Sequence, residues 1–133
     1  MGETVAQTVC DNRISYRPGV WFNSAKFFDI EYQTYGWVWA NTKEGESTLY
    51  WEDTEGEKCL KLVYDTQSLA LLGVNVFGIR LRHKVLDQWI SSALNVEEAI
   101  QRIREANFDP EFFKDHFDEI KTVLQAQLIN TTA

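Results

Sequence analysis

The stretch LLGVNVFGIRLRHKVLDQWI, residues 71–90, contains the point where strand character gives way to helix character. The segment LALLGVNVFG, residues 69–78, is nearly all apolar, which is typical of a central strand. Gly73 inside it predicts a β-bulge or a close approach of another backbone. After Gly78 the apolar side chains recur at helical spacing, at Leu81, Val85, Leu86, Trp89, Ile90 and Ala93. The sequence therefore divides into a strand-rich part and a helical part.

Four more strands are predicted before this point. Residues 27–36 alternate between apolar and polar side chains, so Phe28, Ile30 and Tyr32 are expected on the core face. Three further strands, separated by turn-forming sequences, are expected at 37–40, 48–52 and 59–65. Because short turns join successive strands, the sheet is expected to be an antiparallel meander of about five strands.

Three helices are predicted to follow the sheet, at 80–93, 96–106 and 110–128. Asn95 is the expected N-cap of the second helix, with Glu98 as its capping-box partner. Asp109 is the expected N-cap of the third helix, with Pro110 in its first turn. Strands followed by helices predict an α+β domain in which C-terminal helices cover one face of the sheet.

Composition places limits on function. The 133 residues suffice for one domain, expected at 16–133 behind a flexible leader at 1–15. A net charge of −7 argues against nucleic acid as a partner, and no apolar run is long enough to span a membrane. The leader lacks the apolar stretch of a signal peptide. These features predict a cytoplasmic protein.

The sequence carries no recognisable catalytic or metal-binding motif. Neither a G-x-G-x-x-G fingerprint nor a P-loop occurs, and His83 and His116 lack further ligands at zinc-site spacing. Cys10 and Cys59 form no metal motif, and two unpaired thiols in a reducing compartment are expected, with a disulfide as the alternative. No catalytic residue and no metal ligand is therefore assigned.

Two features could serve an interface. Arg80, Arg82, His83 and Lys84 stand at the expected start of a helix, where positive charge opposes the helix dipole. They either contact an anionic group across an interface or pair with the acidic residues of the domain itself. Trp21 and Phe22 precede the first expected strand, and they either fill the core or meet a partner or cofactor.

The stretch PGVWFNSAKFFDIEYQTYG, residues 18–36, followed by a meander and then residues 71–90, resembles a known family. It is similar to the C-terminal interface domain of FAD-dependent pyridine nucleotide–disulfide oxidoreductases. The nearest branch contains the ferredoxin and rubredoxin reductases and the apoptosis-inducing-factor-like proteins. The resemblance covers roughly residues 16–92 and rests on Pro18, Trp21, Phe22, Ser24, Gly36, Gly73, Val74 and Arg80.

The resemblance implies a domain that is not catalytic alone and follows an FAD domain and an NAD(P)H domain in one parent chain. It also implies contacts with those domains, and a homodimer. Trp21, Phe22, Asn23 and Ser24 would lie at the flavin edge. Relatives often have Trp where this sequence has Asn23, so the residue nearest the flavin stays open among Trp21, Phe22 and Asn23. The isolated chain is expected to bind neither cofactor.

The interface predicted from these arguments comprises Trp21, Phe22, Arg80, Arg82, His83 and Lys84. The histidine–glutamate pair of the disulfide-reducing branch is missing, which argues against a glutathione-reductase-type reaction. A rival hypothesis is a stand-alone ligand-binding or protein-interaction module with an aromatic cleft. Its lining would come from Trp37, Trp39, Trp51 or Tyr50.

Overall fold

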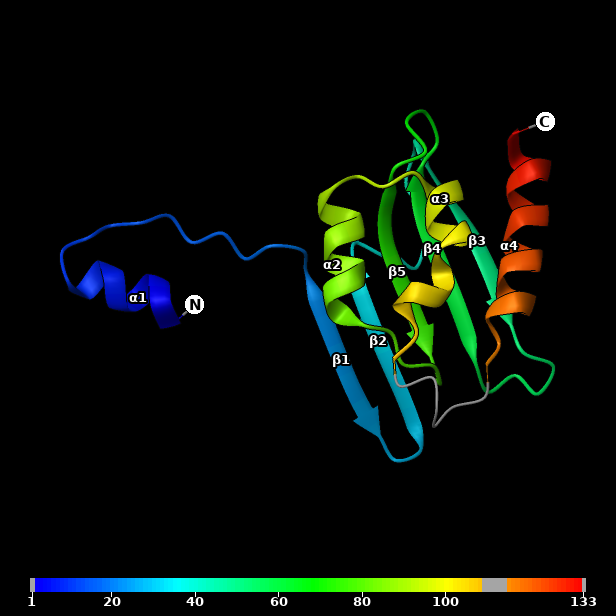
Figure 1. The fold of residues 1–133 in the computed structure, drawn as a ribbon, viewed down its shortest axis with the longest axis horizontal. Helices are drawn as coiled ribbons and strands as arrows, with labels where there is room; N and C mark the ends of the chain where they lie inside the picture. The colour runs from blue at the N-terminus through cyan, green and yellow to red at the C-terminus, as the bar shows by residue number, and fades with distance from the viewer. Residues whose placement is uncertain (1, 109–114, 133) are drawn as a thin grey trace.

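The computed structural model describes residues 2–108 and 115–132 and contains one five-stranded antiparallel sheet with helices over one face (Figure 1). The strands are β1 (Phe22–Phe27), β2 (Ile30–Gly36), β3 (Glu46–Glu52), β4 (Cys59–Asp65) and β5 (Leu71–Phe77). The helices are α1 (Gly2–Val9), α2 (His83–Ser91), α3 (Val96–Gln101), the 3-10 helix η1 (Ile103–Ala106) and α4 (Phe117–Thr132). The α+β class and the antiparallel five-stranded sheet are confirmed.

The strand order is not that of a simple meander. The order across the sheet is β1-β2-β5-β4-β3, so β2 pairs with β5 instead of β3. Strands β3, β4 and β5 form a meander, and β1 and β2 form a separate hairpin attached to its β5 side. The connection between β2 and β3 therefore has to cross from one side of the sheet to the other.

That connection, residues 37–45, passes over the face of the sheet opposite the helices. A Cβ built on Gly73 would lie 2.6 Å from Trp37 O and 2.8 Å from Val38 Cγ2. Farther along, the Lys61 ammonium donates to Trp39 O at 3.2 Å. The predicted close approach at Gly73 is confirmed, and the strand predicted at 37–40 is wrong because this segment bridges strands instead of pairing.

The strand predicted at 27–36 is divided by a turn. Phe28 has a left-handed φ of 54° and, with Asp29, connects β1 to β2. Phe28 and Ile30 are 83% and 59% exposed, so their prediction as core residues is wrong. Tyr32 is half-buried on the open face of the sheet, where its ring lies 5.6 Å from the ring of Phe77, so its prediction as a core residue is also wrong.

The hydrophobic core lies between the sheet and the helix layer. Because side chains alternate along each strand, β3, β4 and β5 each bury apolar side chains on one face. The sheet contributes Tyr35, Leu49, Trp51, Leu60, Leu62, Val74 and Val76. The helices cover them with Leu86, Trp89, Val96, Ile100, Ile103, Ile120, Leu124 and Leu128.

The helical half follows the prediction with shifted boundaries. The helix expected at 80–93 begins at His83, because Arg82 N bonds to Ala106 O and holds the preceding segment extended. Asn95 is the N-cap of α3 and accepts from Glu97 N at 2.8 Å, which confirms that cap. Glu98 instead accepts from the Arg102 guanidinium at 2.8 Å.

The last two predicted helices have different boundaries in the structure. The helix expected at 96–106 is divided into α3 and η1. The predicted cap Asp109 and the following Pro110 lie outside the described residues. Where the description resumes, Asp115 accepts from Phe117 N at 2.9 Å at the start of α4.

Helix α4 lies along β3, the last strand on one side of the sheet (Figure 1). Tyr50 N donates to the Gln127 side-chain oxygen at 2.9 Å, and the Gln127 amide nitrogen donates to Tyr50 O at 2.7 Å. One glutamine thus occupies the two backbone groups that a neighbouring strand would use at this position.

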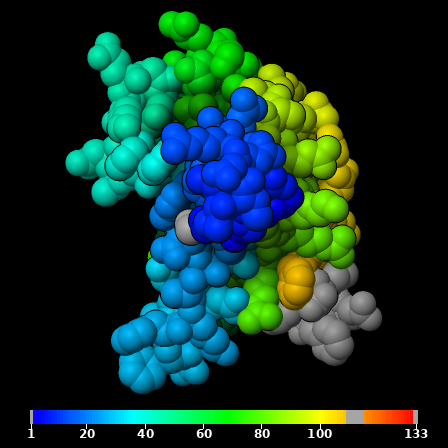
Figure 2. Space-filling model, turned by 90° about the vertical axis from the view of Figure 1, so that its left-hand side faces the viewer, coloured from blue at the N-terminus to red at the C-terminus, as the bar shows by residue number. Residues whose placement is uncertain are grey.

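The predicted leader contains helix α1. None of its residues is buried, and in Figure 1 it stands apart from the sheet on the β1 side. Figure 2, which views that side, shows it in front of the rest of the molecule. Among the described residues, no helix combines the length and the apolar character needed to cross a membrane.

Candidate functional site

A groove of about 800 Å³ opens where β1 begins, and we call it the Trp21 groove. Its lining comes from the end of the leader, the start of β1, the end of β2, β5 and α2. Its lining includes Tyr16, Pro18, Trp21, Phe22, Trp37 and His83. Trp21 and Phe22 are 44% and 39% exposed, so both rings are accessible from the groove.

Three rings from three elements meet at the inner side of the Trp21 groove. The Phe22 ring lies 4.9 Å from the Tyr35 ring and 4.4 Å from the His83 ring. Tyr35 is fully buried, and its hydroxyl donates to Leu81 O at 3.2 Å. Burial raises the pKa of Tyr35 to about 12. The cluster fixes the start of α2 against β1 and β2.

A row of tryptophans continues outward from the groove. Trp21 and Trp37 stack with ring centres 6.0 Å apart and planes 14° apart. Trp37 and Trp39 stack at 5.7 Å and 5°. The Lys43 ammonium lies 3.8 Å from the centre of the Trp39 ring, within the range of a cation–π contact. This row forms an apolar surface that is partly exposed to solvent.

The segment predicted at the flavin edge does not present one uniform surface. Phe22 is the first residue of β1, although it was expected to precede the first strand, and Trp21 comes directly before it. Since successive strand side chains point to opposite faces, Phe22 and Ser24 lie on the helix side, whereas Asn23 lies on the open side. There the Asn23 amide donates to the Tyr32 hydroxyl at 3.3 Å.

The basic run predicted as an interface is also divided. Arg80 donates to the Glu31 carboxylate at 2.7 Å, so its charge is paired within the chain. Arg82, His83 and Lys84 line a second groove of about 600 Å³ together with Phe108. His83 belongs to both grooves, so the structure brings the aromatic segment and the basic run together at this one side chain.

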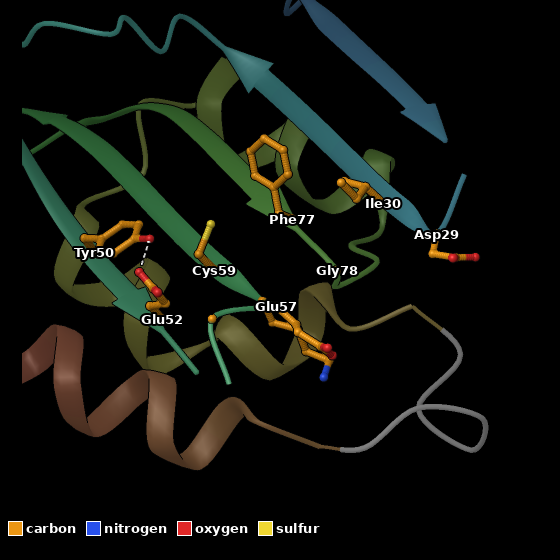
Figure 3. A pocket seen from close by; sticks show the side chains of 10 residues that line it. Asp29, Ile30, Tyr50, Glu52, Glu57, Cys59, Phe77 and Gly78 are labelled. Carbon is orange, nitrogen blue, oxygen red and sulfur yellow. Dashed lines mark hydrogen bonds between the residues drawn. The ribbon is translucent and has the colours of Figure 1, made fainter. Parts of the chain in front are cut away.

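A third groove, of about 700 Å³, lies on the open face of the sheet (Figure 3). Tyr50, Cys59 and Phe77 come from three neighbouring strands, and the rim carries Asp29, Glu52, Glu57 and Lys58. The Tyr50 hydroxyl donates to Glu52 at 2.7 Å, and this bond raises the pKa of Tyr50 above its ordinary value. The rim is mainly acidic.

Sequence reasoning found this third groove only through Tyr50. Its other lining residues come from separate strands, and their meeting depends on a strand order that the prediction did not contain. Trp51, expected as another lining residue, is 2% exposed and belongs to the core. Neighbouring positions of β3 point to opposite faces, so Tyr50 and Trp51 cannot line the same cleft.

Possible metal ligands do not cluster among the described residues. Within residues 2–108 and 115–132, no group of three or more His, Cys, Asp or Glu side chains could hold one. Cys10 is exposed and Cys59 is half-buried, and both are free thiols. Asp115 and Asp118 both pair with Arg104, at 3.3 and 2.7 Å, which assigns these two carboxylates to ion pairs.

No family model matches the chain, and no curated protein matches it either. Two solved structures share its fold. A NAD-dependent persulfide reductase from A. fulgidus is 16% identical with a TM-score of 0.58, over 96% of this chain and 26% of that one. An FAD-dependent pyridine nucleotide-disulphide oxidoreductase from Desulfovibrio vulgaris is 17% identical with a TM-score of 0.50, over 93% of this chain and 30% of that one.

This chain thus has the fold of one part of two larger oxidoreductases. It spans roughly a quarter to a third of the length of these structures, although nearly all of its own length is matched. At such low identity the likeness shows the fold, and function requires a separate argument.

Proposed function

We propose that this chain acts as the C-terminal interface domain of an FAD-dependent NAD(P)H oxidoreductase of the pyridine nucleotide–disulfide type. The observation that carries the proposal is the match of nearly the whole chain to about a quarter to a third of two such larger proteins. The domain packs on the flavin domain, contributes contacts between two copies, and performs no catalysis alone. Its free thiols agree with a reducing cytoplasm.

The residues around the Trp21 groove fit the edge of a flavin ring. Trp21 and Phe22 offer partly exposed aromatic surface, which suits a flat apolar ring system. They do not fit the phosphates of a dinucleotide, because the sequence lacks a glycine-rich phosphate loop. The chain would therefore cover one side of a cofactor that another domain holds.

FAD supplies hydride and electron transfer in such a parent enzyme. The role of this chain is to bury apolar surface, to exclude water and to fix the positions of the domains relative to one another. His83 and Phe22 form the centre of the proposed interface. Phe22 lines the Trp21 groove, and His83, which contacts the Phe22 ring, lines both this groove and the second groove beside Arg82 and Lys84. Aromatic side chains and arginine are the residues that most often anchor interfaces. Trp21, Phe22, Arg82, His83 and Lys84 are accordingly proposed as interface residues, with Arg80 held beside them by Glu31.

The test is to express the complete reading frame that contains this chain and to measure bound flavin by its visible absorbance. Trp21→Ser should weaken flavin retention or change flavin fluorescence. Trp39→Ser is the matched control, because Trp39 is similarly exposed but does not line the Trp21 groove. A reading frame without a nucleotide-binding half, or a flavoprotein indifferent to Trp21→Ser, would contradict the proposal.

A stand-alone binding module is the second candidate function. The observation that favours it is the groove of about 700 Å³ on the open face, lined by Tyr50 and Phe77 (Figure 3). Such a module would act without flavin or nucleotide domains. A stop codon directly upstream of Met1, together with a monomeric protein, would favour this function over the first.

A further inference from the structure

The open face of the sheet carries aromatic side chains where polar ones are usual. An antiparallel sheet that is packed on one face ordinarily turns polar residues to water on the other. Here Tyr32, Phe77 and Cys59 form a row across β2, β5 and β4, because each is paired with the next. Ile30 and Tyr50, on either side of this row, are 59% and 44% exposed. The third groove, which we call the open-face groove, therefore has a largely apolar floor.

The open-face groove is lined by turns as well as by strands (Figure 3). Asp29 comes from the turn between β1 and β2, and Gly56, Glu57 and Lys58 come from the connection between β3 and β4. Its volume of about 700 Å³ lies within the range of small-molecule sites, roughly 300–1,000 Å³. The groove is therefore large enough for a small ligand with an apolar body.

The charges around the open-face groove are mainly negative. Its lining contains the carboxylates of Asp29, Glu52 and Glu57 and a single basic side chain, Lys58. The Lys58 ammonium lies 3.7 Å from the carboxylate of Asp53, which is outside the lining. Within residues 2–108 and 115–132, no ion pair joins the three lining carboxylates to a basic side chain. A recess lined by unpaired charges of one sign attracts ligands of the opposite sign.

One of these carboxylates is held beside an aromatic ring. The Tyr50 hydroxyl donates to Glu52 at 2.7 Å, which fixes the carboxylate next to the ring. A carboxylate and an aromatic face together suit an organic cation, because the first attracts the charge and the second adds a cation–π contact. They suit a phosphate or a carboxylate poorly, because like charges repel. A bare metal ion would leave the apolar floor unused.

We propose that the open-face groove binds a small organic cation, an ammonium group carried on an aromatic or aliphatic body. The body lies against Phe77 and Tyr50, and the ammonium faces the carboxylates of the lining. This inference rests on the second candidate function and deepens it by naming the ligand. It is separate from the proposed flavin contact, because the open-face groove and the Trp21 groove share no lining residue.

Three probes that share one apolar body test the charge preference: phenylethylammonium, phenylethanol and phenylacetate. Each is titrated into the isotope-labelled full chain and followed by NMR. Phenylethylammonium should shift the amide signals of Tyr50, Cys59 and Phe77, and it should bind about ten-fold or more tightly than phenylacetate. Phenylethanol should lie between them. Phenylacetate that binds as tightly as the amine, or amine-induced shifts that are absent from the groove, would overturn the proposal.

Charge reversal at two neighbouring positions tests the site itself. Glu57→Lys changes a lining residue, whereas Glu55→Lys changes an exposed residue of the same turn that does not line the groove. Both variants alter the net charge equally. Glu57→Lys should weaken phenylethylammonium binding about ten-fold, and Glu55→Lys should leave it nearly unchanged. Asp29→Asn is a second lining variant, should Glu57→Lys fold poorly, and it should also weaken binding.

Two further outcomes would count against this ligand class. Equal weakening by Glu57→Lys and Glu55→Lys would show that the amine responds only to the overall charge of the chain. A lysine-rich peptide that binds about ten-fold more tightly than phenylethylammonium would assign the groove to a protein partner and overturn the proposal. A negative titration removes the ligand class, whereas the reading frame and the oligomeric state decide the second candidate function itself.

Discussion

The side-chain amide of Gln127 binds both backbone groups of Tyr50, with distances of 2.9 Å to N and 2.7 Å to O. A helix side chain thereby replaces a strand at one edge of the sheet. Because the contact joins residues far apart in sequence, it connects α4 to β3 directly.

Gln127→Ala should lower the free energy of unfolding by about 1–3 kcal/mol, since two hydrogen bonds worth roughly 0.5–1.5 kcal/mol each are lost. It should also increase aggregation, because the β3 edge becomes available to other strands. Urea denaturation and light scattering measure the two effects. Gln125→Ala, on the same helix, is the control and should change neither. Equal effects from both substitutions would show that helix composition matters instead of the edge contact.

Gly73→Ala should destabilise the domain by about 2 kcal/mol or more, in the range of overpacking in a close-packed interior. The new methyl group would overlap Trp37 O and Val38 Cγ2, at 2.6 and 2.8 Å. Chemical denaturation measures the loss. Gly2→Ala is the control, because a Cβ there meets nothing within 4 Å. A Gly73→Ala variant of unchanged stability would mean that the connection over the sheet moves freely.

Trp21→Ser and Trp51→Ala should differ sharply in stability. Trp51 is 2% exposed in the core, so its truncation should cost about 3–5 kcal/mol. Trp21 is 44% exposed and stacks on Trp37, so its loss should cost about 1 kcal/mol. Denaturation curves of the two variants measure this contrast. If Trp21→Ser unfolds the domain, Trp21 is a core residue and its assignment to an interface fails.

The β1–β2 hairpin is one part of the fold that the sequence did not predict. A period of two across residues 27–36 correctly indicated a strand, but the turn at Phe28 and Asp29 lacks the glycine that usually marks a two-residue hairpin. An aromatic residue in a left-handed conformation has no sequence signal. Because the turn was missed, β1 was not predicted as a separate strand, and Phe28 and Ile30 were placed in the core.

Local signals were reliable where the chain forms its own contacts. Asn95 capped its helix as predicted, and Gly73 marked a close approach. The sequence also predicted Trp21, Phe22 and His83 as site residues, but not their meeting at one groove. That meeting depends on how α2 lies over β1 and β2, which local patterns do not encode.

Tyr35→Phe should change the alkaline stability of the domain. The folded pKa of Tyr35 is raised to about 12, above the ordinary value of about 10, so its contribution is present below pH 10 and lost as pH rises toward 12. At pH 7 the variant should lose about 1 kcal/mol with the bond to Leu81 O. By pH 12 it should be the more stable protein. Denaturation at pH 7 to 12 measures the difference in free energy of unfolding between the wild type and the variant. The other tyrosines are common to both proteins, so their ionisation does not contribute to this difference. A difference that stays constant with pH would contradict the raised pKa.

Titration of the isolated chain with FAD, followed by flavin fluorescence or calorimetry, should show no micromolar binding. The same is expected for NADH and NADPH. The reason is the lack of a phosphate-binding loop in the sequence, since the aromatic groove alone offers no anchor for a dinucleotide. A flavoprotein that binds FAD serves as the positive control. Micromolar binding would show that the domain carries a cofactor site of its own.

The pairing of β2 with β5 has a consequence for how the chain folds. Gly36 of β2 pairs with Gly73 of β5, and β5 comes much later in the chain. The β1–β2 hairpin is therefore synthesised before the strand with which it pairs. Meanwhile β3, β4 and β5 can assemble through short turns, because they are neighbours in sequence as well as in the sheet. Pairing between distant segments closes a longer loop and is slower. We therefore expect β2 to pair with β5 only after the meander has formed, and until then both edges of the hairpin are open to other nascent chains.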